Sequence, residues 1–295
     1  MNNSTELALN ITVTSQRIVL WYEHPECAVA PYGYAFYLAV KVFNFFMGLP
    51  SNLIVMWHIA WHRSKGSTSD LFIFYLALMD AFFCLMTPVE LVNRLYLNDK
   101  GIWHIQNFAY GIKDTAPVFL TCICLDRYVA VVHPIVFTGI RDNRARHAVS
   151  AVVWALVLAF SITESIVGVI AVSDVFAGII LFAFFVMVFC NLSIIFVLRK
   201  SVAGKEVMTP VKKKAFKMVV IVLAIIIVNY LPAVALMPFG SAFKFVMFRC
   251  EIVTAVFSIM DLSCTIEPLV YLIKMDKLTC PCLNLCTNKP HNVDV

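Results

Sequence analysis

The chain has 295 residues, of which 61% are hydrophobic and 14% charged, and its mean hydropathy is +0.85. So many apolar side chains cannot be hidden inside a water-soluble core, which excludes a soluble globular protein and indicates a lipid bilayer as the surroundings. The net charge of +5 would suit a nucleic-acid partner, but the basic residues lie on alternate connections between apolar segments. We therefore expect no nucleic acid.

Seven apolar segments are long enough to cross about 30 Å of hydrocarbon as helices of about 20 residues. They cover residues 34–61, 69–95, 104–131, 147–170, 173–198, 213–239 and 249–274. No linker or second domain interrupts them. The sequence thus predicts an all-α membrane protein, with a seven-transmembrane helix bundle at 34–275 between an N-terminal tail at 1–33 and a C-terminal tail at 276–295.

Lysine and arginine are concentrated after the first, third, fifth and seventh segments. The positive-inside rule makes these connections cytoplasmic, so we expect the N-terminus to be extracellular and the C-terminus cytoplasmic. The first thirty residues lack the features of a cleavable signal peptide. Glycan acceptor sequences begin at Asn2, Asn3 and Asn10, and they matter only if this tail is extracellular.

Polar residues recur where the segments should be apolar. Such residues are costly in lipid unless they are paired, protonated or bound to a cation, so they are candidates for a functional site. They are Asn52, Asp80, Asp126, Arg127, Tyr128, Tyr230, Asp261, Ser263, Glu267 and Tyr271, with Pro232 and Pro268 as potential kinks.

Taken in order, these motifs resemble those of the rhodopsin-like (class A) G-protein-coupled receptors. The matching positions are Asn52, Asp80 in Leu-Ala-x-x-Asp, Asp126-Arg127-Tyr128, Trp154, Pro232, and Pro268 to Tyr271 for the family's Asn-Pro-x-x-Tyr element. Gly48-Leu49-Pro50, and the stretch Val131 to Ile135 with Pro134, are similar to the branch of purinergic, protease-activated and hydroxycarboxylic-acid receptors.

The resemblance implies a multi-pass receptor of the plasma membrane rather than an enzyme. It would transmit binding of an extracellular ligand to a heterotrimeric G protein, with arrestin as a further candidate partner. Coupling and activation residues implied in this way are Asp126, Arg127, Tyr128, Pro134, Asn191, Pro232, Glu267, Pro268 and Tyr271. A polar core or sodium site is implied at Asn52, Asp80, Ser263 and Glu267, and no other cofactor is expected.

Several positions depart from the family pattern. Glu267 stands in place of the usual Asn or Asp, Tyr230 in place of Trp, and Asn191 in place of the tyrosine of the fifth helix. These departures leave a second interpretation open, a decoy receptor that binds ligand without signalling. A transporter is less favoured because no internal repeat is present.

Ten cysteines are spread along the chain. Those within helices, at Cys84, Cys122, Cys124, Cys190 and Cys264, are expected to be reduced core residues. A disulfide between Cys27 and Cys250 would resemble the tail-to-third-loop bridge of purinergic and chemokine receptors. The last three, Cys280, Cys282 and Cys286, follow the final helix and are palmitoylation candidates, with a zinc site that includes His291 as the alternative.

The outer half of the bundle carries candidate ligand-binding residues for a small anionic metabolite, nucleotide or lipid. They are Glu90, Arg94, Tyr110, Lys113, Tyr230, Arg249 and Asp261. Lys113 should point into the bundle, where it either pairs with Asp261 or Asp80 or anchors a ligand carboxylate or phosphate. Lys41, by contrast, is expected to extend its charge toward the membrane surface.

Overall fold

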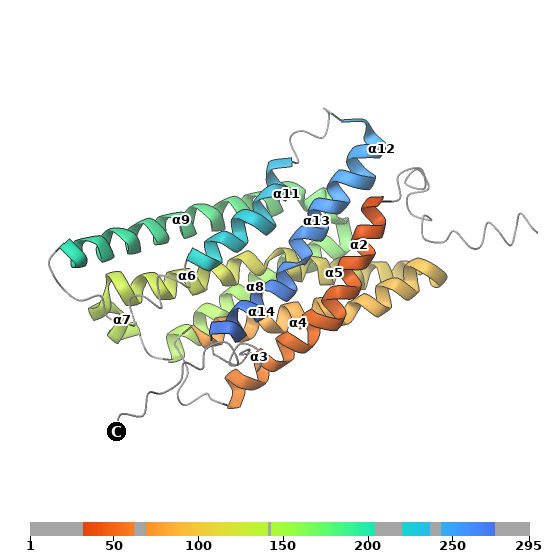
Figure 1. The fold of residues 1–295 in the computed structure, drawn as a ribbon. Helices are drawn as coiled ribbons and strands as arrows, with labels where there is room; N and C mark the ends of the chain where they lie inside the picture. Colours follow the sequence, from red (N-terminus) through yellow and green to blue (C-terminus); the bar gives the residue numbers. More distant parts are fainter. Residues whose placement is uncertain (1–31, 62–68, 141–142, 204–219, 237–242, 275–295) are drawn as a thin grey trace, which may run out of the picture.

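The computed structural model describes residues 32–61, 69–140, 143–203, 220–236 and 243–274 (Figure 1). Six of its helices are long and apolar enough to span a membrane, and a seventh at Val220–Leu236 is shorter. The predicted all-α seven-helix bundle is therefore confirmed, whereas the sides on which the termini lie stay a prediction. The glycan acceptors Asn2, Asn3 and Asn10 lie outside the described residues, as do Cys27, Cys280, Cys282 and Cys286.

The first two spans each contain a π-helical turn. The elements are α2 (Tyr32–Phe43), η3 (Asn44–Gly48), α3 (Leu49–Trp61), α4 (Asp70–Val92) and η4 (Asn93–Leu97). Pro50 explains the first turn, because proline has no N–H to donate to the preceding turn and the helix must adjust there. The widened turn brings Asn44 to the interior of the bundle, where its side chain is buried.

The third span is broken at Thr115, between α5 (Lys100–Asp114) and α6 (Ala116–Val132). Pro117 cannot donate a hydrogen bond back into α5, and the Thr115 hydroxyl instead donates to the carbonyls of Gly111 at 3.0 Å and Ile112 at 2.8 Å. The short helix α7 (Pro134–Ile140) follows α6. The break lies just after Lys113 and fixes its position in mid-bundle.

The fourth and fifth spans are joined with almost no loop. Helix α8 (Asn143–Val167) is followed by Gly168, the 3₁₀ turn η5 (Val169–Val172) and α9 (Ser173–Ala203). Gly168 has φ of +86°, a left-handed value that favours glycine and permits the sharp reversal. This agrees with the apolar run that the sequence shows on both sides of Gly168.

The last two spans bring the end of the chain back to its beginning. Their elements are η6 (Ile226–Tyr230), α11 (Leu231–Leu236), α12 (Phe245–Met247), η8 (Phe248–Val253), α13 (Thr254–Asp261) and α14 (Ser263–Lys274). Helix α2 packs against α13, and α3 against α14, so the red and blue segments of Figure 1 lie side by side. This closure places residues of the first and seventh spans in one interior.

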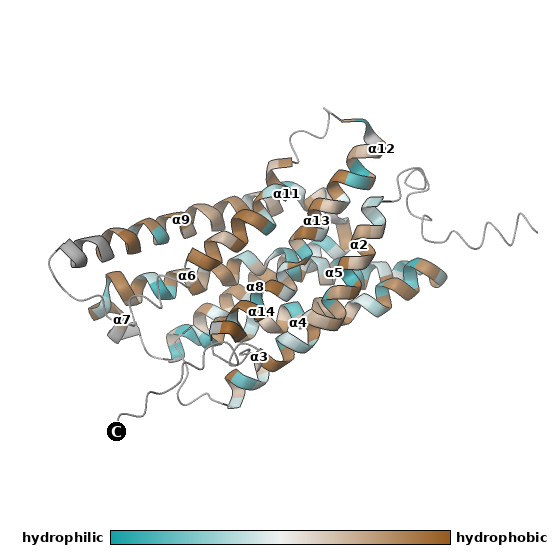
Figure 2. Cartoon of the chain, in the orientation of Figure 1, coloured by the Kyte–Doolittle hydropathy of each residue, from teal (hydrophilic) through white to brown (hydrophobic). Residues whose placement is uncertain are grey.

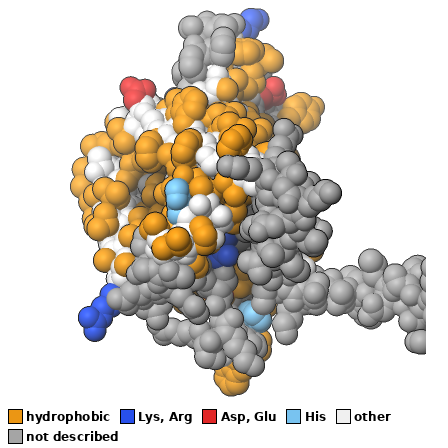
Figure 3. All heavy atoms as spheres, turned by 90° about the vertical axis from the view of Figure 1, so that its left-hand side faces the viewer, with side chains coloured by type: hydrophobic (Ala, Val, Ile, Leu, Met, Phe, Trp, Pro, Cys, Tyr) orange, Lys and Arg blue, Asp and Glu red, His pale blue; other side chains and the backbone are white. Residues whose placement is uncertain are grey.

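The outer surface of the bundle is apolar. Along α9, which is largely brown in Figure 2, Phe182, Phe185 and Phe196 are 65–70% exposed. The end-on view in Figure 3 likewise shows hydrophobic side chains over most of its described surface. Such a surface is stable against lipid, and the polar residues gather inside.

Candidate functional site

A buried lysine and two carboxyl groups meet in the middle of the bundle, in a group we call the Lys113 cluster (Asp80, Lys113, Tyr230, Ser263 and Glu267). The Lys113 Nζ donates to Asp80 Oδ1 at 2.9 Å and to the Tyr230 hydroxyl at 3.0 Å. The Tyr230 oxygen lies 3.1 Å from Ser263 Oγ and 3.4 Å from Glu267 Oε1. One ammonium group thus connects α5, α4, η6 and α14.

The Lys113 cluster supplies its own cation. Lys113 is fully buried and its charge is directed at Asp80, the first carboxylate of the predicted sodium site. A sodium ion would compete for that carboxylate, so the site does not fit sodium while Lys113 is seated there. Among the described residues, no group of three or more His, Cys, Asp or Glu side chains is placed to hold a metal ion.

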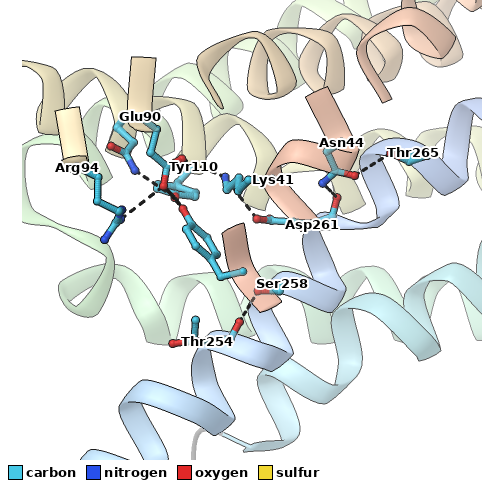
Figure 4. Close-up of polar contacts among 11 residues, drawn as sticks. Lys41, Asn44, Glu90, Arg94, Tyr110, Thr254, Ser258, Asp261 and Thr265 are labelled. Atoms are coloured by element: carbon cyan, nitrogen blue, oxygen red, sulfur yellow. Dashed lines mark hydrogen bonds and ion pairs between the residues drawn. The ribbon is translucent and has the colours of Figure 1, made fainter. Parts of the chain in front are cut away.

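A second buried lysine, Lys41 of α2, lies between carboxylates of α4 and α13 (Figure 4). The Lys41 Nζ lies 3.3 Å from Glu90 Oε2 and 3.4 Å from Asp261 Oδ2, and its side chain is 2% exposed. The hydroxyls of Tyr37 and Tyr110 both donate to Glu90 Oε1. We call these five residues the Lys41 cluster.

The expectation that Lys41 extends toward the membrane surface is therefore wrong. Its side chain points into the bundle, where Glu90 and Asp261 provide counter-charges for the buried ammonium group. Sequence reasoning also missed Tyr37 and Asn44. The spacing of Tyr37, Lys41 and Asn44, four and three residues apart, would have placed all three on one helix face.

Arg94 borders the Lys41 cluster. Its Nη2 lies 3.5 Å from Glu90 Oε1, and its guanidinium carbon lies 4.9 Å from the ring centre of Trp103 and 5.6 Å from that of Tyr37. The Arg94 side chain is 10% exposed, whereas that of Lys113 is 0% exposed. Of these two predicted ligand-binding cations, Arg94 is the one nearer to solvent.

A third polar group, the Arg127 cluster, lies at the end of α6 and consists of Ser69, Asp126, Arg127 and Arg146. The Arg127 Nη2 lies 3.3 Å from Asp126 Oδ2, as the Asp-Arg-Tyr motif predicts. Ser69 donates to the same Asp126 oxygen at 2.7 Å and accepts from Arg127 Nε at 2.6 Å. Arg146 of α8 approaches Asp126 Oδ1 at 3.7 Å.

Ser69 and Arg146 were not recognised in the sequence. Ser69 precedes the apolar run of α4 and so has the signature of a helix N-cap. Its hydroxyl makes no capping bond and is directed to α6 instead. Tyr128 turns away from this group, and its hydroxyl lies 3.2 Å from His133 Nε2, next to Pro134 at the start of α7.

The other predicted site residues are dispersed. Asn52 donates to the carbonyls of Gly48 at 2.9 Å and Cys264 at 2.8 Å and does not enter the Lys113 cluster. Asn191 donates to the Met187 carbonyl within α9. Pro232 lies just after η6, Arg249 lies in η8, and Pro268 and Tyr271 lie within α14.

The described cysteines divide as expected into two kinds. Cys84, Cys122, Cys124, Cys190 and Cys264 are free thiols within helices. Cys250 is buried and disulfide-bonded. Cys27, its predicted partner, lies outside the described residues, so this pairing stays a prediction.

Seven spanning helices around buried charges, with an Asp-Arg pair at one end, are the architecture of a seven-helix membrane receptor. Residues 51–173 match the family model described as "7 transmembrane receptor (rhodopsin family)". This match supports the resemblance of the chain to the rhodopsin-like (class A) G-protein-coupled receptors, whose members are receptors rather than enzymes.

The relatives that the chain resembles include receptors of the purinergic and protease-activated branch. It is 28% identical to a purinoceptor of Gallus gallus over 70% of this chain and 65% of that protein. It is 27% identical to "Uracil nucleotide/cysteinyl leukotriene receptor" of Rattus norvegicus over 64% of this chain and 62% of that protein. It is 27% identical to "Proteinase-activated receptor 3" of Rattus norvegicus over 43% of this chain and 36% of that protein. Each of these matches spans less than two thirds of the relative's length.

Proposed function

We propose that this chain is a plasma-membrane receptor that transmits binding of an extracellular ligand to a cytoplasmic heterotrimeric G protein. The observation that carries this proposal is the Arg127 cluster, in which a charged side chain at the end of α6 is held by Asp126 of the same helix and by Ser69 at the start of α4. Arrestin would bind at the same cytoplasmic end.

The Arg127 cluster has the properties of a releasable lock. Arg127 and Asp126 are only partly buried, with side chains 15% and 8% exposed, so water can replace their mutual contact. Ser69 holds both members, and movement of α4 against α6 breaks three contacts together. An agonist can shift the equilibrium between the held and the released state of Arg127 only by the amount by which it binds the released state more tightly than the held one.

The ligand enters near the Lys41 cluster, and we propose that it is a small anion such as a nucleotide, an acidic metabolite or a lysolipid. Arg94 is its anchor, because its guanidinium is more accessible than the ammonium groups of Lys41 and Lys113. Two of the relatives are named as a purinoceptor and a uracil nucleotide receptor, which supports this ligand class. An anion on Arg94 weakens the contact between Arg94 and Glu90 and so disturbs the Lys41 cluster.

The test is G-protein activation in membranes of cells that express the chain, screened with nucleotides, acidic metabolites and lysolipids. We expect one of these classes to activate, and Arg127→Ala to abolish activation without changing the number of receptors at the surface. Arg144→Ala is the matched control, since Arg144 is an exposed arginine on α8 close to the same end. A constitutively active receptor establishes that the assay responds.

A decoy receptor is the second candidate, because Tyr230, Asn191 and Glu267 depart from the family pattern. It predicts a different result in the same assay: a ligand of the screen binds with saturation, yet the wild-type chain activates no G protein. That outcome would overturn the signalling proposal. Activation that survives Arg127→Ala unchanged would remove the role given to the Arg127 cluster.

A further inference from the structure

The ammonium group of Lys41 is surrounded by aromatic rings as well as by carboxylates. Its Nζ lies 3.7 Å from the ring centre of Phe83, 4.6 Å from that of Tyr110 and 5.4 Å from that of Tyr37. Glu90 and Asp261 complete the enclosure at 3.3 and 3.4 Å. Aromatic faces together with carboxylates are the surroundings in which proteins bind organic cations.

The enclosure formed by Tyr37, Phe83, Glu90, Tyr110 and Asp261, which we call the cage, is held in shape by contacts that do not involve Lys41. Gln106 Nε2 donates to the Tyr110 hydroxyl at 3.2 Å, and that hydroxyl donates to Glu90 at 2.9 Å. On the other side, Asn44 donates to the backbone carbonyl of Asp261 at 2.8 Å (Figure 4). Because these contacts position the Glu90 carboxylate and the Asp261 backbone from outside, the cage should keep its shape when the lysine side chain is removed.

We propose that Phe83, Tyr37, Tyr110, Glu90 and Asp261 form a binding site for a primary ammonium group, which the chain fills with its own Lys41. Lys41 therefore acts as a tethered internal ligand that joins α2 to α4, α5 and α13. The site selects a primary amine over a quaternary one, since two carboxylates within 3.4 Å call for N–H donors. An external amine binds when the lysine side chain is absent.

The experiment removes the tethered ligand and returns it as a free molecule. Lys41→Ala keeps the β-carbon, and the atoms that it deletes correspond to n-propylammonium. We expect purified Lys41→Ala receptor to melt at a lower temperature than the wild type. Millimolar n-propylammonium chloride should raise this melting temperature with saturation, while the wild type, whose cage is occupied, should not respond.

Four matched comparisons test the chemistry of the cage. Neither n-propanol, which lacks the charge, nor tetramethylammonium, which lacks N–H donors, should stabilise Lys41→Ala. The double variant Lys41→Ala with Phe83→Leu should need about tenfold more n-propylammonium, because it lacks the nearest ring. The double variant with Asp261→Asn should respond least of all.

The proposal is overturned if Lys41→Ala is as stable as the wild type, if n-propanol stabilises Lys41→Ala as well as n-propylammonium does, or if n-propylammonium stabilises the wild type equally.

Should Lys41→Ala fail to fold, amine labelling of the wild type decides instead. Reductive methylation should modify the exposed Lys100 and spare Lys41 until the protein is denatured. Equal modification of both in folded receptor would refute the cage. These readouts measure binding and stability, so they do not depend on whether the receptor signals.

Discussion

Lys113 brings a positive charge to the centre of the bundle, 2.9 Å from Asp80 Oδ1. Replacing Lys113 by Met keeps much of its volume but leaves a buried carboxylate without its counter-charge, which typically costs about 3–5 kcal/mol. We therefore expect Lys113→Met to lower the melting temperature of purified receptor and its number at the cell surface, in the absence of any ligand.

A second substitution separates this effect from a role in ligand binding. Asp80→Asn removes the unpaired charge, so the double variant should be more stable than Lys113→Met alone, and a double-mutant cycle measures the coupling. If Lys113→Met keeps full stability and loses only the response to agonist, Lys113 is a ligand anchor and the internal pairing is of minor importance.

Ser69 is the residue that links both charged members of the Arg127 cluster to α4. A hydrogen bond to a charged group contributes about 1.5–3 kcal/mol, so Ser69→Ala should favour the released state by roughly tenfold or more. The measurement is basal G-protein activation without agonist, which we expect to rise. Thr163→Ala is the control, because Thr163 is exposed and its hydroxyl donates to the Ala159 carbonyl of its own helix. Unchanged basal activity in Ser69→Ala would show that Ser69 has no part in the lock.

Some of these residues could be predicted from the sequence and others could not. Asp80 and Lys113 stand out because a charge in mid-membrane needs a partner, and the sequence offered Asp80 as one of two. Lys41 lies near the end of its span, where the sequence does not distinguish a lysine that faces lipid from one that faces the bundle interior. Its partners, Glu90 and Asp261, lie on two other helices, so helix packing determines its direction and local pattern does not.

Close packing of α5 on α8 depends on Gly111. A β-carbon at Gly111 would lie 2.6 Å from the Ser161 α-carbon, so any larger side chain must push the two helices apart. Gly111→Val should therefore lower the melting temperature by several degrees or prevent folding. Circular dichroism or a thiol-reactive dye in purified receptor would follow the loss.

Gly178 of α9 provides the matched control for Gly111. Among the described residues, no side chain and no backbone atom of another segment lies within 4 Å of the β-carbon that alanine would add there, and alanine is favoured over glycine in a helix by about 1 kcal/mol. Gly178→Ala should leave stability unchanged or raise it slightly. Equal tolerance of Gly111→Val and Gly178→Ala would mean that α5 and α8 are not in contact as described.

Helix positions followed from the sequence because apolar length alone determines where a chain can cross lipid. The predicted span 249–274 corresponds to an observed apolar helix at Phe248–Ile273, a difference of one residue at each end. The π-helical turns η3 and η6 were not predicted, although Pro50 and Pro232 lie just beyond them. Proline indicates that a helix must adjust but does not specify how, and packing against neighbouring helices decides between a kink and a widened turn.

The whole molecule is held together by charges that its helices share. Lys41 joins the first span to the second and seventh, Lys113 joins the third to the second and sixth, and Arg127 joins the third to the second. The second span takes part in all three groups. A ligand that moves α4 at one end can therefore reach Arg127 at the other through one continuous helix, without a chain of side chains between them.

Orientation in the membrane follows from the basic residues, which are concentrated on the connections after the odd-numbered spans. We expect the N-terminal tail to be extracellular and to carry glycans, because only that side of the membrane meets the glycosylation machinery. Glycosidase treatment should reduce the apparent mass of the wild-type chain, and replacing Asn2, Asn3 and Asn10 together by Gln should abolish this shift. A C-terminal epitope should become accessible to antibody only after the cells are permeabilised. If intact cells expose that epitope, or if both tails are cleaved by protease from the same side, an odd number of crossings is ruled out, and the Arg127 cluster would lose its place on the G-protein side.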